Sequence, residues 1–287
     1  MQRILSQHGQ KIVSSKPYSE QTPDERKEMI QKKCDSYNES EGNLNQIDGY
    51  ECKLCKNRGD IAFVQENRGQ YYETLKDCKC KPIRRSIMRM KRSGLESVIH
   101  RYTFDSYQAT DQWQQLMKSR SVEFVQDERA NMLFFGGASG SGKSHLCTAV
   151  TAYYLRKGKS AYYMLWKDEA TRLKSIVMDD EAYQKAIHAL KTVDVLYIDD
   201  FWKPVKTKDG GTSQPTEADI SLAYELLNYR YNNPEYITII SSERYATEIF
   251  EIDEAIGGRL IERAGRYAIN VKRDPSKNYR VKHMEFI

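Results

Sequence analysis

The sequence predicts an α/β protein with a central parallel sheet, preceded by a small helical and metal-binding N-terminal region. From about residue 100 onward, short apolar runs alternate with amphipathic segments, which is typical of a parallel sheet with helices on both faces. A glycine-rich phosphate-binding motif follows the first of these runs. Upstream of it, two close pairs of cysteines have the spacing of metal ligands.

Composition limits the classes of protein that need to be considered. The chain has 287 residues, enough for one large domain or for a medium domain with a small companion. Lysine and arginine number 45 against 40 acidic residues, and this mild excess of +5 permits contact with phosphate backbones without requiring it. We find neither a signal peptide nor an apolar membrane span, so we expect a cytoplasmic protein with no membrane partner. Six cysteines in a reducing compartment favour metal binding over disulfides.

The expected N-terminal region covers residues 1–95. A helix is expected to start at the sequence "TPDE", residues 22–25, and to run through "ERKEMIQKKC". Two runs rich in valine, phenylalanine and tyrosine flank the turn "ENRGQ", as in a hairpin. A basic helix follows at residues 81–94, with apolar Ile83, Ile87 and Met90 at helical spacing and Gly94 as its expected end.

The second domain is expected over residues 96–287. Its predicted strands are "NMLFFGG", "SAYYMLW", "VDVLYIDD", "YITIISS" and "RYAINVK". Predicted helices include "KSHLCTAVTAYYLRKG" and "EADISLAYELLNYRY", and residues 203–217 are predicted to form an exposed loop.

The phosphate-binding motif indicates a nucleotide site. In a P-loop, backbone N–H groups surround the phosphates, the lysine reaches the β- and γ-oxygens, and the next hydroxyl ligates Mg²⁺. The lysine here is Lys143 and the hydroxyl belongs to Ser144. The residues expected to bind the nucleotide are Gly137, Ala138, Ser139, Gly140, Ser141, Gly142, Lys143, Ser144 and His145. The alternative is a flexible glycine- and serine-rich loop that matches by chance.

Two acidic residues end the strand "VDVLYIDD". Asp199 is expected to hold Mg²⁺ together with Ser144, and Asp200 to orient and polarise the attacking water. Aspartate is shorter than the glutamate that is usual for the second role, so we expect slow turnover. The alternative is that the two acids cap the start of a helix.

Residues that could sense or stabilise the γ-phosphate follow further along. Ser241 and Ser242 end the strand "YITIISS", and we take Ser242 as the sensor. Arg259 and Arg263 lie four residues apart, hence on one helix face, where an arginine could act across a subunit boundary. The alternative is a solvated or salt-bridged helix face.

The cysteine pairs Cys52-x₂-Cys55 and Cys78-x-Cys80 are separated by a hairpin-length segment and can close a tetrahedral site of four sulfurs for Zn²⁺. The zinc module covers about residues 50–82, and its metal would replace the core that so short a segment lacks. Cys34 is left over, and His100 is a remote alternative ligand. Four incidental buried thiols are the alternative interpretation.

The order of the motifs "GASGSGKSHL", "VLYIDDF", "LNYRY", "TIISSE" and "GGRLIER" resembles the helicase-loader branch of the AAA+ ATPases, the DnaC/DnaI-type loaders of bacteria and their phage relatives. The resemblance covers about residues 50–287 and includes the cysteine module, which some loaders share. Lys143, Ser144, Asp199, Asp200 and Arg259 match by position. Glu243 departs from the pattern, because the family usually has an asparagine there.

The resemblance implies an ATPase that uses ATP, Mg²⁺ and Zn²⁺. Its N-terminal region would bind a hexameric replicative DNA helicase, and its AAA+ domain would bind single-stranded DNA and self-associate through an arginine finger. The protein would deliver the helicase onto single-stranded DNA at the start of replication. The basic helix "IRRSIMRMKR" could contact phosphates, bind an acidic partner or be solvated, and Phe201 and Trp202 either stack on bases or pack in the core.

Three other functions remain open on the sequence. A transposition helper ATPase would bind duplex DNA well. A small-molecule P-loop kinase would turn over without DNA or self-association, and Asp199 and Asp200 would position its acceptor hydroxyl. A zinc-bearing binding module with a purely structural nucleotide site would keep its partner after the change Lys143→Ala.

Overall fold

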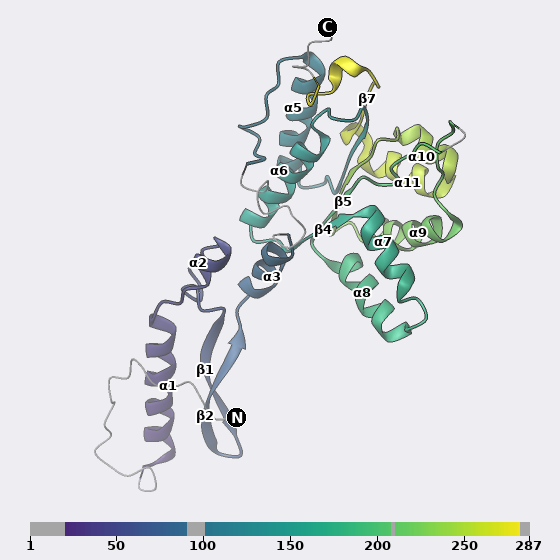
Figure 1. The fold of residues 1–287 in the computed structure, drawn as a ribbon. Helices are drawn as coiled ribbons and strands as arrows, with labels where there is room; N and C mark the ends of the chain where they lie inside the picture. The colour runs from purple at the N-terminus through teal and green to yellow at the C-terminus, as the bar shows by residue number, and fades with distance from the viewer. Residues whose placement is uncertain (1–20, 91–100, 208–209, 282–287) are drawn as a thin grey trace. The chain divides into compact units, whose positions relative to one another are not determined.

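The structure is a computed structural model that describes residues 21–90, 101–207 and 210–281 (Figure 1). The chain divides into two compact units, residues 1–84 and 85–287. The boundary expected at residues 95 and 96 lies outside the described residues, as do His100 and the expected helix end at Gly94.

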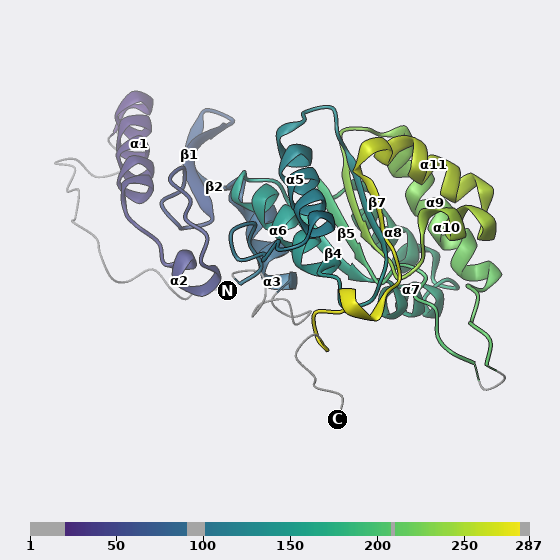
Figure 2. The ribbon, with the colours of Figure 1, turned by 90° about the horizontal axis from the view of Figure 1, so that it is seen from above.

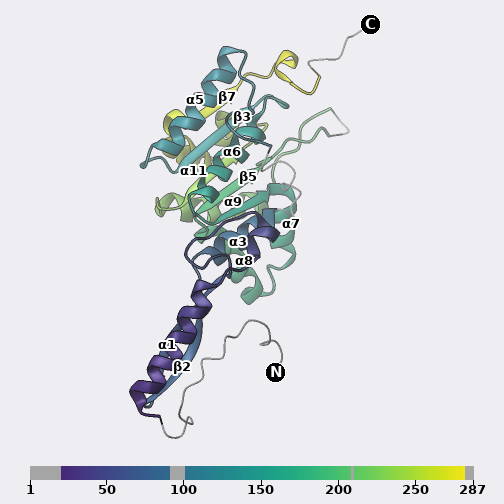
Figure 3. The ribbon, with the colours of Figure 1, turned by 90° about the vertical axis from the view of Figure 1, so that its left-hand side faces the viewer.

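The first unit combines a long helix with a β-hairpin. Helix α1 covers Pro23–Glu39, and Thr22 and Glu25 form a capping box at its start, as the sequence predicts. Helix α2 covers Leu44–Asp48, and strands β1 (Asp60–Asn67) and β2 (Gln70–Asp77) form the predicted antiparallel hairpin. Helix α3, Cys80–Met90, begins in this unit and confirms the predicted basic helix over residues 81–90, the part of it that the structure describes. Helix α1 lies along the hairpin (Figure 3).

The hairpin turns at Arg68 and Gly69, which both have positive φ angles, 52° and 77°. This is the backbone geometry of the two-residue turn that matches the twist of a hairpin. Cys34 is fully buried between α1 and the hairpin, next to Ile30 and Ala62. Cys34 is therefore a core residue of this unit.

The second unit is built on a five-stranded parallel sheet in the order β4-β5-β6-β3-β7. The strands are β3 (Met132–Gly137), β4 (Ala161–Leu165), β5 (Val195–Asp199), β6 (Ile237–Ser241) and β7 (Ala268–Val271). All five predicted strands are confirmed, and so is the predicted α/β class. Strands β3, β5 and β6 are buried along their whole length, which explains their uninterrupted apolar sequences.

Helices cover both faces of the sheet (Figure 2). Helices α5 (Gln112–Gln126) and α6 (Lys143–Arg156) lie on one face. The other face carries α7 (Trp166–Ser175), α8 (Asp180–Thr192), α9 (Glu217–Asn232), α10 (Ala246–Ile252) and α11 (Glu254–Ala264). Two 3₁₀ turns, Gly265–Tyr267 and Pro275–Lys277, flank β7 in the chain.

A buried arginine joins several of these elements. Arg230 of α9 is 2% exposed. Its guanidinium donates to the hydroxyl of Thr238 at 2.8 Å and to the carbonyl of Ile237 at 2.7 Å. It also donates to the carbonyls that end α8 and lead into β5, those of Leu190, Lys191 and Val193. Arg230 therefore satisfies carbonyl groups that would otherwise be buried without a donor.

Within the described residues, no helix is both long enough and apolar enough to cross a membrane.

Candidate functional site

The P-loop connects the end of β3 to the start of α6. Gly142 caps α6 with a φ angle of 86°, and a Cβ atom there would lie 2.7 Å from the ring of Tyr107. The ammonium of Lys143 is buried and donates to the carbonyls of Gly137 at 3.0 Å and Ala138 at 2.6 Å. The lysine thus lies inside the loop, at the N-terminus of a helix, where backbone N–H groups and the helix dipole attract an anion.

Carboxylates surround the buried ammonium. Burial lowers the pKa of Lys143, and the negative charges of Glu243, Asp200 and Asp199 oppose this shift. All three acids are therefore close enough to Lys143 to act on its charge. The ammonium is suited to a bound phosphate, whereas carboxylates are suited to the metal ion that accompanies the phosphate.

Asp199, the last residue of β5, accepts hydrogen bonds from side chains of α6, β6 and β4. The hydroxyl of Ser144 donates to Oδ1 of Asp199 at 3.1 Å, and the hydroxyl of Ser241 also donates to Oδ1. The phenol of Tyr163, on β4, donates to Oδ2 at 3.1 Å. A hydroxyl and a carboxylate this close are the oxygen donors that Mg²⁺ prefers. Ser144 and Asp199 would therefore hold the metal ion.

The second acid has an unusual backbone conformation. Asp200 has a φ angle of 52°, in the left-handed region that is uncommon for residues other than glycine. The ammonium of Lys203 lies 2.9 Å from Oδ2 of Asp200 and 3.3 Å from Oε1 of Glu243. Burial lowers the pKa of Lys203, but the hydrogen bond to Asp200 and the charges of both acids outweigh it and raise the pKa overall.

The predicted sensor is fully buried and occupied by other contacts. The hydroxyl of Ser242 donates to the carbonyl of Phe201 at 2.6 Å and accepts the N–H of Arg244 at 2.9 Å. The neighbouring serine that reaches the metal-side acid is Ser241, because alternate residues of a strand point to opposite sides. The role of Ser242 as the sensor therefore stays a prediction, and Ser241 is the serine that contacts Asp199.

His145 packs against the segment that precedes α5. Its ring stacks on Tyr102 with the ring centres 4.4 Å apart, and Nε2 lies 2.9 Å from the carbonyl of Thr103. Burial lowers the pKa of this histidine, although the hydrogen bond to Thr103 opposes the shift. The contacts place His145 beside the loop as a packing residue.

Residues near the C-terminal end of the described chain also reach the P-loop. The N–H of Tyr279 donates to the carbonyl of Gly140 at 3.0 Å, and the side chain of Asn278 occupies the space where a Cβ of Gly140 would lie. The phenol of Tyr279 donates to the side chain of Gln108 at 3.1 Å. Sequence reasoning did not find these residues, or Tyr107 and Tyr163, because nothing in their local sequence marks a partner so far along the chain.

The two predicted arginines lie on α11 and contact α9. Arg263 donates to the carbonyl of Tyr231 at 2.6 Å, and the guanidinium of Arg263 is 4.6 Å from the centre of the Tyr231 ring. The guanidinium of Arg259 lies 5.2 Å from the ring of Tyr224 and 5.7 Å from that of Tyr231. Arg259 also lines an open surface hollow of about 510 Å³, together with Glu254 and Glu262. The described contacts of both arginines lie within α9 and α11, not at the P-loop.

The aromatic residues that follow Asp200 belong to the core. Phe201 is fully buried, Trp202 is 3% exposed, and their rings stack with centres 4.6 Å apart. The packing interpretation is confirmed, and a base-stacking role for these two rings is excluded by their burial.

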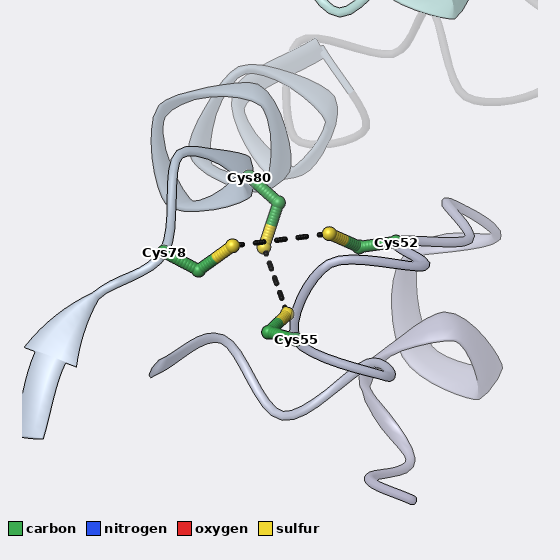
Figure 4. A group of neighbouring side chains, drawn as sticks. All are labelled: Cys52, Cys55, Cys78 and Cys80. Carbon is green, nitrogen blue, oxygen red and sulfur yellow. Dashed lines mark hydrogen bonds between the residues drawn. The ribbon is translucent and has the colours of Figure 1, made fainter. Parts of the chain in front are cut away.

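The four predicted metal-binding cysteines meet in the first unit (Figure 4). Their sulfur atoms all lie within 4.8 Å of one another, and all six cysteines of the chain are free and buried. The Sγ atoms of Cys52 and Cys78 are 3.8 Å apart, and those of Cys55 and Cys80 are 3.6 Å apart. Zn–S bonds of about 2.3 Å give a tetrahedron with edges of about 3.8 Å. The cluster therefore fits Zn²⁺.

Hydrogen-bond donors around the cluster suit thiolate sulfurs. The N–H of Gly59 donates to Cys55 Sγ at 3.3 Å, and Nε of Arg84 donates to Cys80 Sγ at 3.4 Å. Burial alone would raise the pKa of Cys55, but the hydrogen bonds from Gly59 and the neighbouring thiols lower it to about 7. Burial raises the pKa of Cys78 and Cys80. N–H groups that donate to metal-ligating sulfur atoms orient these ligands and reduce their negative charge.

Arg84 is fixed by this cluster and by an acid. It is buried, and its Nη1 donates to both carboxylate oxygens of Asp48, at 2.6 and 2.7 Å. Its remaining nitrogen donates to the side chain of Asn57 at 3.0 Å. Arg84 therefore has a structural role, although the sequence placed it in a helix that could contact phosphates.

The sheet order, the P-loop after β3 and the acid that ends β5 define a P-loop AAA+ ATP-binding domain. A family model described as "IstB-like ATP binding protein" matches residues 76–266. The chain therefore belongs to the IstB-like ATP-binding protein family.

The chain is similar to several curated proteins and to solved structures. The phage-like element PBSX protein XkdC of Bacillus subtilis (strain 168) is 27% identical over 232 residues, 78% of this chain and 83% of that protein. The replicative helicase loader DnaC of Escherichia coli (strain K12) is 25% identical over 120 residues, 41% of this chain and 49% of DnaC. The match thus spans about half of DnaC. A crystal structure of the DnaC helicase loader has a TM-score of 0.49 and 24% identity, covering 61% of this chain and 98% of that one.

Proposed function

We propose that this protein is an ATPase that binds a hexameric replicative DNA helicase and delivers it onto single-stranded DNA when replication starts. The observation that carries the proposal is the combination, in one chain, of a P-loop site joined to its metal-side acid and a separate unit built around four cysteines. The similarity to relatives named as replicative helicase loaders supports it. This function would place the protein in the cytoplasm.

The residues of the site have complementary roles in ATP hydrolysis. Lys143 and the P-loop N–H groups would bind the phosphates, and Ser144 and Asp199 would hold the Mg²⁺ that draws charge from them. Asp200 would orient and polarise the attacking water. Arg259, on the open face of α11, would reach the nucleotide of a neighbouring copy and stabilise the transition state.

We propose that the first unit binds the helicase. Phe63 and Tyr72 are 39% and 47% exposed on the hairpin. In a strand, neighbouring residues point to opposite faces, so these aromatic side chains lie on the face opposite Ala62, which packs against α1. Exposed aromatic side chains are frequent anchors of protein interfaces.

The test is size-exclusion chromatography with light scattering on the protein mixed with a bacterial replicative helicase, with and without ATP. The proposal predicts a stable complex, which Phe63→Ser combined with Tyr72→Ser weakens while the ATP affinity is retained. It also predicts that the wild-type complex gains single-stranded DNA only with ATP. No complex with any hexameric helicase, together with ATP-dependent filaments on duplex DNA, would favour a transposition helper instead. A complex whose DNA binding persists in Lys143→Ala would indicate a structural nucleotide site.

A further inference from the structure

The site contains an acid where a neutral residue would suit a triphosphate better. Glu243 lies two residues beyond the end of β6, whose last residue, Ser241, pairs with Phe135 of β3, the strand that leads into the P-loop. The N–H of Ser242 donates to the carbonyl of Phe135 at 2.9 Å, so the segment that carries Glu243 is attached to the strand that leads into the P-loop. The carboxylate of Glu243 therefore lies on the P-loop side of the sheet, and its charge also acts on the ammonium of Lys143. A negative charge there would repel the additional phosphate of ATP.

The ammonium of Lys203 lies between Glu243 and Asp200, the acid that directly follows β5. The ammonium of Lys203 is 3.3 Å from Glu243 and 2.9 Å from Asp200, so it neutralises charge on both. The side chain of Lys203 is 46% exposed, and ion pairs as exposed as this contribute little to stability. The effect of this pair should therefore appear in nucleotide binding more than in folding.

Hydrogen bonds from the side chain of Arg244 to backbone carbonyls hold the loop that carries Lys203 in place. Arg244 donates from Nε to the carbonyl of Trp202 at 2.7 Å, and Nη2 of Arg244 donates to the carbonyl of Ser213. The N–H of Val205 donates a hydrogen bond to the hydroxyl of Ser213 at 3.0 Å. Arg244 is next to Glu243 in the chain, so the loop that carries Lys203 is attached to the segment that carries the acid it neutralises.

We propose that Lys203 is a nucleotide-selecting residue, whose ammonium neutralises Glu243 and thereby allows the γ-phosphate of ATP to bind. The inference rests on the proposed use of ATP by this site and adds the residue that makes the site discriminate ATP from ADP. ADP lacks the phosphate that Glu243 would repel, so its binding does not depend on Lys203.

The test is calorimetric titration of the full-length protein with Mg²⁺ and either ADP or a non-hydrolysable ATP analogue. Lys203→Ala is expected to weaken binding of the ATP analogue about fivefold or more, because two unit charges at 4 Å interact by about 1 kcal/mol even in water. ADP affinity should change by less than about twofold. Lys203→Arg should retain the wild-type preference, because it keeps the charge.

A double variant separates a charge effect from a structural one. Glu243→Gln added to Lys203→Ala should restore affinity for the ATP analogue, because it removes the charge that needs neutralising. Lys206→Ala, at an exposed position of the same loop, is the matched control and should leave both affinities unchanged. Equal weakening of ADP and ATP binding in Lys203→Ala, or no restoration in the double variant, would overturn the inference.

These titrations need no helicase. A wild-type protein that selects ATP through Lys203 but binds no helicase would leave the inference standing and overturn the proposed function. A wild-type protein that binds neither nucleotide would overturn both.

Discussion

The hydroxyl of Ser144, in the first turn of α6, donates a hydrogen bond to Oδ1 of Asp199 at the end of β5, over 3.1 Å. This contact joins the P-loop to the acid expected to hold Mg²⁺, although 55 positions separate the two residues in the chain.

We expect Asp199→Asn to lower Mg²⁺-dependent ATP turnover about a hundredfold, because the metal ion supplies several kcal/mol of charge stabilisation in phosphoryl transfer. Steady-state phosphate release measures this. Asp194→Asn is the matched control, since Asp194 precedes the same strand at its opposite end and accepts hydrogen bonds from Ser160. Turnover that falls equally in both variants would contradict a metal-binding role for Asp199.

The two arginines of α11 should behave differently when truncated. Arg263 donates to the carbonyl of Tyr231, so Arg263→Ala should destabilise the fold by about 1 kcal/mol. Arg259→Ala should leave the melting temperature unchanged and should lower ATP turnover at protein concentrations where copies associate. Thermal melting and turnover measured against protein concentration test this. If the ATP turnover per copy of the wild-type protein does not rise with protein concentration, Arg259 does not act on the nucleotide of a neighbouring copy.

The cysteine cluster should bind one zinc ion per chain. Cys78→Ser should lose this metal, because it removes one of four sulfur ligands. Cys34→Ala should keep it, because Cys34 lies in the core between α1 and the hairpin. Metal analysis of the purified proteins gives the stoichiometry. We also expect a strong chelator to unfold part of the first unit, since metal binding and folding are coupled in such small modules. Zinc retained in Cys78→Ser would contradict the four-sulfur assignment.

Arg230 should be important for stability. Arg230→Lys is expected to cost about 3 kcal/mol, because a lysine cannot reproduce the five donor contacts and leaves buried carbonyls without partners. Denaturant unfolding measures the free energy, and Arg129→Lys at an exposed position is the control. A loss as small as that of the control would show that the contacts of Arg230 are readily replaced.

The sequence predicted the sheet well because its strands are apolar, short and separated by clear helical segments. It also predicted the P-loop, the acid at the end of β5 and the four cysteines, because each has a fixed local spacing. The contacts of Tyr163, Asn278 and Lys203 could not be predicted, since their partners are brought close only by the strand order and by the path of the chain after β7.

Arg230 is an intermediate case. It follows Leu226 and Leu227 by four and three residues, so it lies on the same buried face of α9 as these two leucines. A charged residue at helical spacing from two leucines indicates a buried charge with hydrogen-bond partners. Its partners, the carbonyls at the end of α8, were not predictable because they come from another helix.

In the proposed function, ATP drives transfer of a helicase onto single-stranded DNA. The most direct measurement is the amount of a hexameric replicative helicase retained on circular single-stranded DNA, with the wild-type protein or with Lys143→Ala, and with or without ATP. We expect retention only when the wild-type protein and ATP are both present. Retention that is the same without ATP, or the same with Lys143→Ala, would contradict it.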